Sequence, residues 1–93
     1  MNKKIRTKEV EALFEAILTL KDQEECFRFF EDLCTAGELL SLSQRLQVAK
    51  MLRGKSTYLE IAEATGASTA TISRVNRALS YGEDGYDLVF ERI

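Results

Sequence analysis

Two T-x-x-E sequences constrain the fold of this chain most strongly, because each marks the start of a helix. Thr35 with Glu38 and Thr57 with Glu60 each stand directly before a run of helix-forming residues. In such a capping box the two side chains accept hydrogen bonds from backbone N–H groups that the first helical turn leaves unpaired. The chain has no proline that would interrupt the following helices. These signals predict a helical protein.

Apolar periodicity predicts two further helices before Thr35. Both have an apolar stripe at helical spacing, formed first by Val10, Leu13, Phe14 and Ile17 and then by Cys26, Phe27, Phe30, Leu33 and Cys34. Thr7 and Asp22 stand where the capping residues of these two helices are expected. The cysteines are eight positions apart on one helix, roughly 12 Å along its axis, which is too far for an unstrained disulfide. We expect both to be buried without a chemical role.

Glycine and serine divide the C-terminal half into shorter helices. Gly54 is expected to end the helix that begins at Thr35, close behind Lys50 and Arg53, whose charges suit a helix C-terminus. Gly66 is expected to end the helix that begins at Thr57, because glycine readily adopts the left-handed backbone of a helix end. Ser68 is expected to cap the next helix, and a last short helix contains Leu88 and Val89. We therefore predict an all-α fold with six helices and no strand, forming a single domain over residues 1–93.

Two short helices joined at a glycine have the form of a helix-turn-helix, which we place at about residues 57–80. If Ile72, Val75 and Leu79 face the core, the opposite face of the second helix has short polar side chains and two arginines. Such a face fits the DNA major groove, where hydroxyls and arginine can bond base edges or phosphates. We expect the DNA contacts to come from Lys55, Ser68, Thr69, Ala70, Thr71, Ser73, Arg74 and Arg77. The alternative is a solvated face on which Ser68 serves only as a helix cap.

The charge distribution agrees with DNA contact, although the net charge of −2 does not. From Gln44 to Arg77 there are six basic and two acidic residues, a local charge of +4, whereas the remaining residues carry −6. A positive segment around the predicted helix-turn-helix suits a polyanionic partner.

Residue types limit the other classes of function. The chain has no histidine, which removes the usual zinc ligand and acid-base catalyst, and it has no glycine-rich phosphate loop. We therefore expect no enzyme activity, no metal and no cofactor. The sequence also has no apolar run long enough to span a membrane and no secretory leader, so we expect a cytoplasmic protein without a membrane partner.

The stretch GASTATISR, together with MLRGKS before it, resembles the helix-turn-helix of the Trp repressor superfamily. The longer stretch LSQRLQVAKMLRGKSTYLEIAEATGASTATISRVNRALSYGEDGYDLV is similar to the YerC/YecD-type branch of that superfamily, and the resemblance covers nearly the whole chain. It implies a six-helix Trp repressor-like fold and an intertwined homodimer held by the leading helices. It also implies a bacterial, sequence-specific transcriptional regulator whose partners are double-stranded DNA and a second copy of itself.

The resemblance further implies a small-molecule effector pocket formed by Gln44, Arg45, Arg74 and Ala78. In the Trp repressor the arginine corresponding to Arg74 helps to enclose the tryptophan ring, and a second arginine comes from the third helix. Alignment without a gap places Gln44 at that second position, and Arg45 reaches it only after a shift of one residue, which turns a helix by about 100°. Ala78 replaces a serine near the tryptophan amino group. We therefore expect an unknown effector or none, and not tryptophan.

A second class of function is a helical protein–protein interaction module that uses the same helix pair without direct DNA contact. An apolar outer face on the second helix would favour such a module. The local positive charge and the short polar side chains of this face favour DNA instead.

Overall fold

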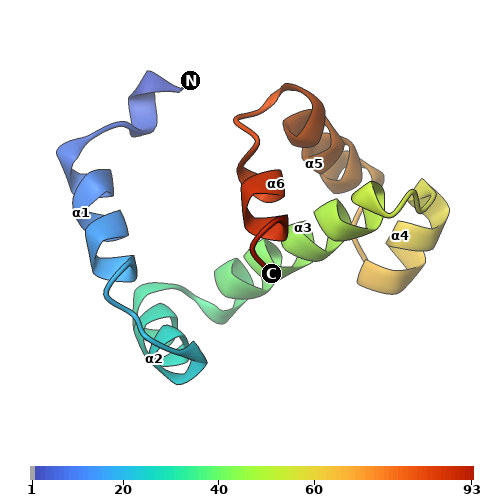
Figure 1. The fold of residues 1–93 in the computed structure, drawn as a ribbon. Helices are drawn as coiled ribbons and strands as arrows, with labels where there is room; N and C mark the ends of the chain where they lie inside the picture. Colours follow the sequence, from blue (N-terminus) through green and yellow to red (C-terminus); the bar gives the residue numbers. More distant parts are fainter. Residues whose placement is uncertain (1) are drawn as a thin grey trace. The chain divides into compact units, whose positions relative to one another are not determined.

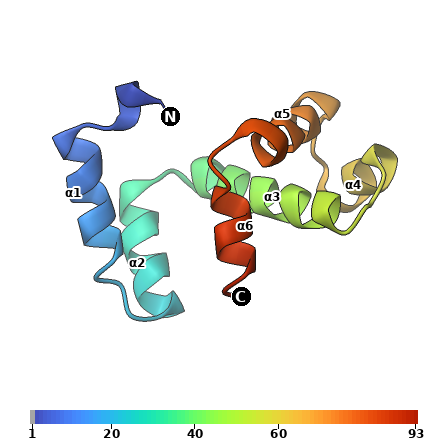
Figure 2. The ribbon, with the colours of Figure 1, turned by 45° about the horizontal axis from the view of Figure 1, so that its top comes forward.

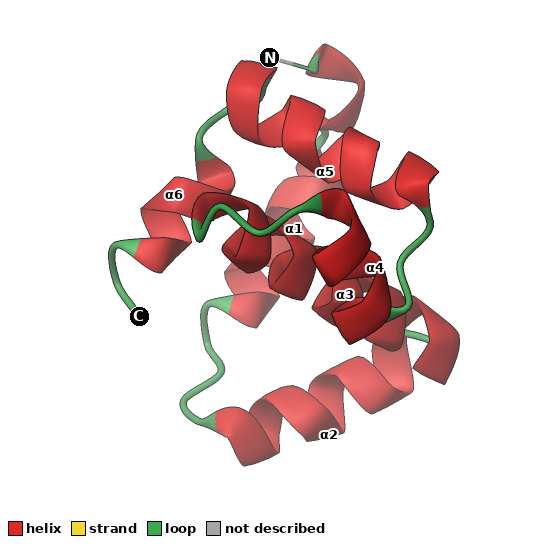
Figure 3. Ribbon diagram, turned by 90° about the vertical axis from the view of Figure 1, so that its right-hand side faces the viewer, coloured by secondary structure: helices red, strands yellow, loops and turns green. Residues whose placement is uncertain are grey.

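The computed structural model describes residues 2–93, and all regular structure within that range is helical, as predicted (Figure 3). A short 3-10 helix at Lys3–Ile5 comes first and was not predicted. The six α-helices are α1 (Lys8–Ile17), α2 (Gln23–Leu33), α3 (Ala36–Arg53), α4 (Tyr58–Thr65), α5 (Thr69–Tyr81) and α6 (Gly85–Phe90).

Side-chain caps begin five of these helices at the residues that the sequence indicated. Thr7 Oγ1, Asp22 Oδ1 and Ser68 Oγ accept hydrogen bonds from backbone N–H groups in the first turns of α1, α2 and α5. Both capping boxes form: the Thr35 N–H donates to Glu38 Oε1 and the Thr57 N–H to Glu60 Oε1, each at 2.8 Å. These bonds are local, which explains why the sequence alone located the helix starts.

The chain divides into two compact units, Met1–Leu39 and Leu40–Ile93. In the first unit no described residue is buried, although α1 and α2 have apolar faces. Phe14 and Phe27 each expose more than half of their surface, and Phe29 and Phe30 make an edge-to-face contact with ring centres 5.6 Å apart. The apolar residues of α1 and α2 are therefore left largely uncovered within one chain.

The cysteines do not lie in a core. Cys26 is exposed, Cys34 is half-buried at the end of α2, and both are free thiols. The expectation of two buried cysteines was wrong for the single chain, because the apolar face of α2 on which they lie is not covered.

The second unit contains the core, which α4 and α5 build against α3. Its seven buried residues are Val48, Ala49, Ile61, Ala67, Ile72, Val75 and Leu79. Tyr86 and Phe90 of α6 pack against this group, and their rings stack with centres 6.2 Å apart. In Figures 1 and 2, α4 and α5 lie beside the C-terminal part of α3, and the α6 ribbon crosses α3 nearer its other end.

Two left-handed residues make the turns on either side of α4. Gly66 ends α4 with φ 72°, as expected. Gly54 directly follows the last residue of α3, as expected, and the left-handed residue of that turn is Lys55 with φ 67°. The Lys55 N–H donates to the Leu52 carbonyl and the Ser56 N–H to the Met51 carbonyl, the hydrogen-bond pattern of a Schellman turn. A lysine in this conformation costs about 1 kcal/mol that a glycine would not.

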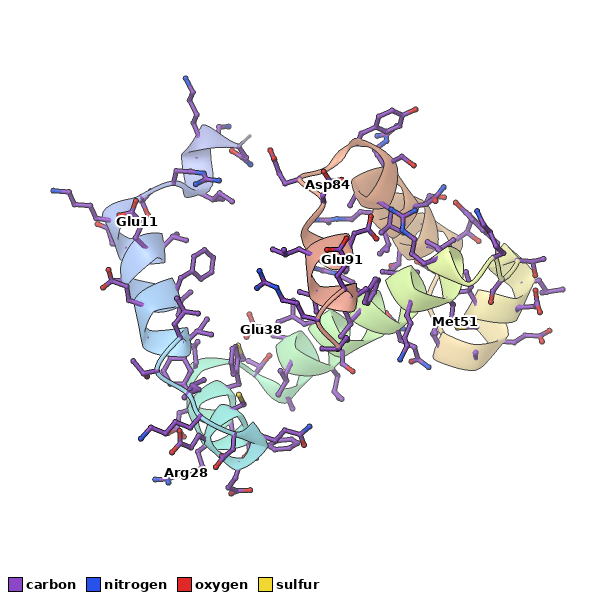
Figure 4. The ribbon with its side chains drawn as sticks, viewed as in Figure 1. Glu11, Arg28, Glu38, Met51, Asp84 and Glu91 are labelled. Atoms are coloured by element: carbon purple, nitrogen blue, oxygen red, sulfur yellow. The ribbon has the colours of Figure 1, made fainter. Side chains whose placement is uncertain are left out.

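A third left-handed residue, Asp84 with φ 59°, precedes α6 (Figure 4). Its side chain does not cap α6. Arg53 of α3 forms a bidentate ion pair with Asp87 in the first turn of α6. Its Nε lies 2.9 Å from Oδ1, and an Nη lies 2.7 Å from Oδ2. This pair fixes α6 to the C-terminal end of α3. Within residues 2–93, no helix is long and apolar enough to cross a membrane.

The left-handed backbone of Gly66 leads to a test of the turn. A Cβ at Gly66 would meet no atom within 4 Å, so a substitution there acts through the backbone alone. Gly66→Val should lower the free energy of unfolding by about 1 kcal/mol or more, because a β-branched residue is disfavoured at positive φ. Gly37→Ala is the control, since Gly37 has equally open surroundings without a positive φ and should show no loss. Urea denaturation measures both, and equal stabilities would contradict the assigned turn.

Three carboxylates link stability to pH. Hydrogen bonds from Thr35 and Thr57 lower the pKa of Glu38 and of Glu60, and the hydrogen bond from Arg53 lowers the pKa of Asp87. A lowered pKa in the folded state means that the stabilisation is present above the unfolded pKa, about 4, and is lost as the pH falls through the folded value.

The free energy of unfolding, measured by denaturation at several pH values between about 2 and 7, checks this expectation. Glu60→Gln should reduce the loss of stability on acidification, because glutamine keeps an acceptor oxygen but does not titrate. Glu63→Gln is the control on the same helix, since the Glu63 side chain is exposed and makes no hydrogen bond within the described chain. An identical pH dependence of the Glu60→Gln variant and the unsubstituted chain would contradict the assignment.

Candidate nucleic-acid interface

The helix-turn-helix consists of α4, the turn at residues 66–68 and α5. Thr65 connects the end of α4 to the turn, because its hydroxyl donates to the Ile61 carbonyl at 2.8 Å and accepts from the Ala67 N–H at 3.1 Å. Ala67, directly after Gly66, is buried in the core. The turn is therefore held both by this apolar contact and by the hydrogen bonds of Thr65. The start of α5 is thereby fixed relative to α4.

The two faces of α5 differ sharply in burial. Ile72, Val75 and Leu79 are all buried, as the sequence predicted. Of the eight predicted DNA-contacting residues, all but one are exposed: Lys55, Ser68, Thr69, Ala70, Ser73, Arg74 and Arg77. Thr71 is half-buried. The structure therefore places six exposed candidates on α5 or at its start, and Lys55 in the turn before α4.

Ser68 and Thr71 are engaged with each other. Ser68 Oγ accepts from the Thr71 N–H and donates to Thr71 Oγ1, both at 3.1 Å. Ser68 thus has the structural role of an N-cap, which was the alternative reading of this residue. Thr69, Ala70 and Ser73 make no side-chain hydrogen bond within the described residues and are available to a partner.

The two arginines of α5 line an open hollow of about 580 Å³. Neither Arg74 nor Arg77 forms an ion pair within residues 2–93. The hollow is lined by Tyr58, Ala70, Ser73, Arg74, Asn76, Arg77, Ser80 and Tyr81. Two unpaired guanidinium groups among hydroxyl and amide groups make a surface that can bind phosphate and base edges.

Four residues of this hollow were missed by the sequence analysis. Asn76, Ser80 and Tyr81 follow the predicted contacts at helical spacing on α5, so continuing the exposed face by one turn would have found Ser80 and Tyr81. Tyr58 comes from the first turn of α4. No local sequence signal connects Tyr58 with α5, because their proximity depends on the angle between the two helices.

Lys55 is exposed in the turn that precedes α4. Lys55 is the left-handed residue of the Schellman turn that ends α3, and it lies two residues before Thr57, the N-cap of α4. Strained non-glycine residues of this kind are often retained for function. The ammonium group at this place extends the positive charge of the helix-turn-helix beyond α5.

No hollow described in the structure is lined by all four residues of the expected effector pocket. Arg45 and Ala78 line a hollow of about 490 Å³ with residues of α3 and α6 and of the turn before α6. Arg74 lines the different hollow on the outer face of α5. Gln44 lines neither hollow, and its Nε2 donates to the Thr65 carbonyl at 3.1 Å.

Within residues 2–93 there is also no group of three or more acidic or cysteine side chains that could hold a metal ion.

Comparisons with known proteins identify the family. The profile of the Trp repressor protein family matches residues 8–93. The uncharacterised protein YerC of Bacillus subtilis is 59% identical over 90 residues, which span 97% of this chain and 86% of that protein.

Two solved structures have the same fold. A TrpR-like protein from Eubacterium eligens superimposes with a TM-score of 0.95 at 69% identity, covering 98% of this chain and 94% of that one. A candidate Trp repressor from Staphylococcus aureus gives a TM-score of 0.93 at 54% identity, covering 97% and 90% of the two chains. The six-helix architecture and the match along nearly the whole sequence agree, and the chain belongs to the Trp repressor family.

Proposed function

We propose that this protein is a DNA-binding transcriptional regulator that reads specific sequences with α5. The observation that carries the proposal is the outer face of α5, where short polar side chains accompany Arg74 and Arg77, both exposed and without ion pairs in the described chain. A helix with such a face, preceded by a tight turn and supported by a buried inner face, is the usual reading element of a helix-turn-helix. Membership of the Trp repressor family supports the same function.

Each candidate contact has a distinct role in this proposal. Lys55 and Arg77 bind phosphates, which sets affinity and position but not sequence preference. Thr69, Ala70 and Ser73 face the base edges, where hydroxyls form hydrogen bonds and the alanine methyl contacts a thymine methyl. Arg74 contacts DNA from the same face. Ser68 and Thr71 act by holding the start of α5 in place, in keeping with their mutual hydrogen bonds.

We also propose that the regulator is a homodimer. Large apolar side chains on α1, α2 and α3 are exposed within one chain: Phe14, Leu18, Phe27, Leu33, Leu40, Leu42 and Leu46. So many exposed large apolar side chains, in both units of the chain, are rarely left in water. A second copy that covers them would present two reading helices to successive major grooves, as dimeric helix-turn-helix proteins do.

A protein–protein interaction module remains the competing function. It would need an apolar face on α5, whereas the exposed part of α5 consists mainly of hydroxyl, amide and guanidinium groups. Selection of binding sites from random duplexes decides between the two functions, because a regulator of this kind should recover a palindromic sequence and an interaction module should recover none.

Substitutions should separate the phosphate contacts from the base contacts. Arg77→Ala and Lys55→Ala should weaken binding to selected and scrambled duplexes alike, and each should reduce the salt dependence of the binding constant by about one counterion. Thr69→Ala and Ser73→Ala should mainly change which sequence is preferred. Titrations with both duplexes at two salt concentrations measure this. Salt-independent binding would refute the phosphate role.

Sedimentation at low micromolar concentration tests the homodimer. The unsubstituted chain should sediment as a dimer, and Phe27→Asp should weaken association because it places a charge on the exposed apolar face of α2. Tyr81→Asp is the control, since Tyr81 is a large exposed side chain on α5, outside the proposed interface. A well-folded monomer of the unsubstituted chain would contradict the dimer.

Tryptophan should not control DNA binding. An aromatic ring enclosed by two guanidinium groups gains roughly 0.5–2 kcal/mol from each, and here Arg74 and Arg45 line separate hollows while Gln44 is bonded to Thr65. Calorimetry with L-tryptophan should show no binding in the low micromolar range, and DNA affinity should be the same with and without it. Tryptophan binding coupled to tighter DNA binding would overturn this expectation.

A further inference from the structure

Two side chains of α3 bind the C-terminal ends of the two helices of the helix-turn-helix. Gln44 Nε2 donates to the carbonyl of Thr65, the last residue of α4, at 3.1 Å. An Nη of Arg53 donates to the carbonyl of Leu79, in the last turn of α5, at 3.3 Å. Both contacts are partly buried, and each joins residues more than twenty positions apart.

The acceptors of these bonds are carbonyls at helix ends. The last four carbonyls of an α-helix have no N–H partner within the helix, and their partial negative charge favours a donor or a cation. Gln44 supplies a neutral donor to α4, and Arg53 supplies a charged donor to α5. Asp87 holds the Arg53 guanidinium by two further hydrogen bonds, which restricts the orientation of the group that caps α5.

The positions of Gln44 and Arg53 on α3 make the pair suited to hold an angle. They are nine residues apart, roughly 13 Å along the helix axis and about half a turn around it. On a helical wheel they fall on the two sides of the core-facing stripe that contains Val48, Ala49 and Leu52. Hydrogen bonds therefore join α4 and α5 to α3 on both sides of the apolar stripe through which the helices pack.

The apolar contact by itself does not set this angle firmly. Hydrophobic burial is non-directional, so Val48 and Ala49 would tolerate a small rotation of α4 and α5 about α3. Hydrogen bonds depend steeply on distance and angle. Rotation in either direction lengthens at least one of the two bonds, because they lie on opposite sides of the stripe.

We infer that Gln44 and Arg53 are positioning residues for DNA recognition, which hold α5 at its reading angle in the DNA-free protein without a small-molecule effector. This inference rests on the proposed function, and it adds the residues through which the site is preset. Neither residue needs to contact DNA for this role. The structural basis of this positioning role is the pair of hydrogen bonds from Gln44 and Arg53 to the carbonyls of Thr65 and Leu79.

The first arm of the test uses the protein without DNA. Gln44→Met keeps the size of the side chain and removes its donor, and Gln47→Met is the matched control because Gln47 is exposed on the same helix without a side-chain hydrogen bond in the described chain. Amide hydrogen exchange in α4 and the turn should become about fivefold to tenfold faster in Gln44→Met only, as expected for the loss of one partly buried hydrogen bond. Unchanged exchange would overturn the inference.

For α5, Arg53→Lys keeps the charge but loses the planar fork. Asp87→Asn leaves the guanidinium able to donate to the Leu79 carbonyl. Exchange in the last turn of α5 should therefore increase more in Arg53→Lys than in Asp87→Asn. Equal effects would assign the role to the ion pair and not to the cap, which would also overturn the inference for Arg53.

The second arm measures DNA binding at a temperature well below the melting point of each variant. Gln44→Met and Arg53→Lys should each lose about tenfold in affinity for a selected duplex. Binding to a scrambled duplex, and the salt dependence of binding, should stay as in the unsubstituted chain because no phosphate contact is removed. Unchanged specific affinity, or a salt dependence reduced by about one counterion, would contradict a positioning role.

The two arms distinguish failure of the inference from failure of the proposed function. If the unsubstituted chain binds no duplex, the proposed function is wrong and the role in DNA recognition falls with it. Amide exchange then still shows whether the two caps hold α4 and α5. If the unsubstituted chain binds DNA and the variants match it in both arms, only the inference fails.

Discussion

The packing of α4 and α5 against one side of α3 is the interaction on which the rest of the structure depends. Every buried residue of the described chain belongs to this contact, with Val48 and Ala49 on α3 opposed by side chains from α4, the turn and α5. A core of this size is small, and small domains have little stability in reserve. The turn, the α6 contact and the orientation of the outer face of α5 all depend on it.

The same packing divides α5 into a buried face and an exposed polar face. Ile72, Val75 and Leu79 are buried in the core, whereas Thr69, Ser73, Arg74 and Arg77 are exposed and form no side-chain hydrogen bond or ion pair within the described residues. Short side chains near the start of α5 allow close approach to a groove. The directional bonds from Gln44 and Arg53 then complement an apolar contact that is strong but not specific in angle.

The first unit, by contrast, has well-formed helices but no buried residue among those described. Its helices begin at well-formed caps and have clear apolar faces, yet none of its described residues is buried. Local hydrogen bonds therefore define these helices, while the burial that would stabilise them is absent from one chain. Exposed phenylalanine and leucine side chains on α1 and α2 are the physical reason for expecting a second copy.

The sequence by itself determined the helices and much of the exposed polar face of α5, because those depend on interactions within a few residues. Capping bonds join positions three apart, Gly66 meets the need for a left-handed residue, and helical spacing separates the inner face of α5 from the outer one. Gly54 directly follows the last residue of α3, as the sequence indicated, but no sequence signal showed that the next residue, Lys55, is left-handed.

Only the tertiary structure decided which distant residues meet. Tyr58 joins the hollow on α5, Arg74 and Arg45 line different hollows, and Gln44 binds a carbonyl 21 positions away. No periodicity or motif encodes these pairings, because they depend on the angles at which the helices cross. Those angles result from the packing of the buried side chains together with long-range hydrogen bonds such as those of Gln44 and Arg53, and a single sequence does not show these residue by residue.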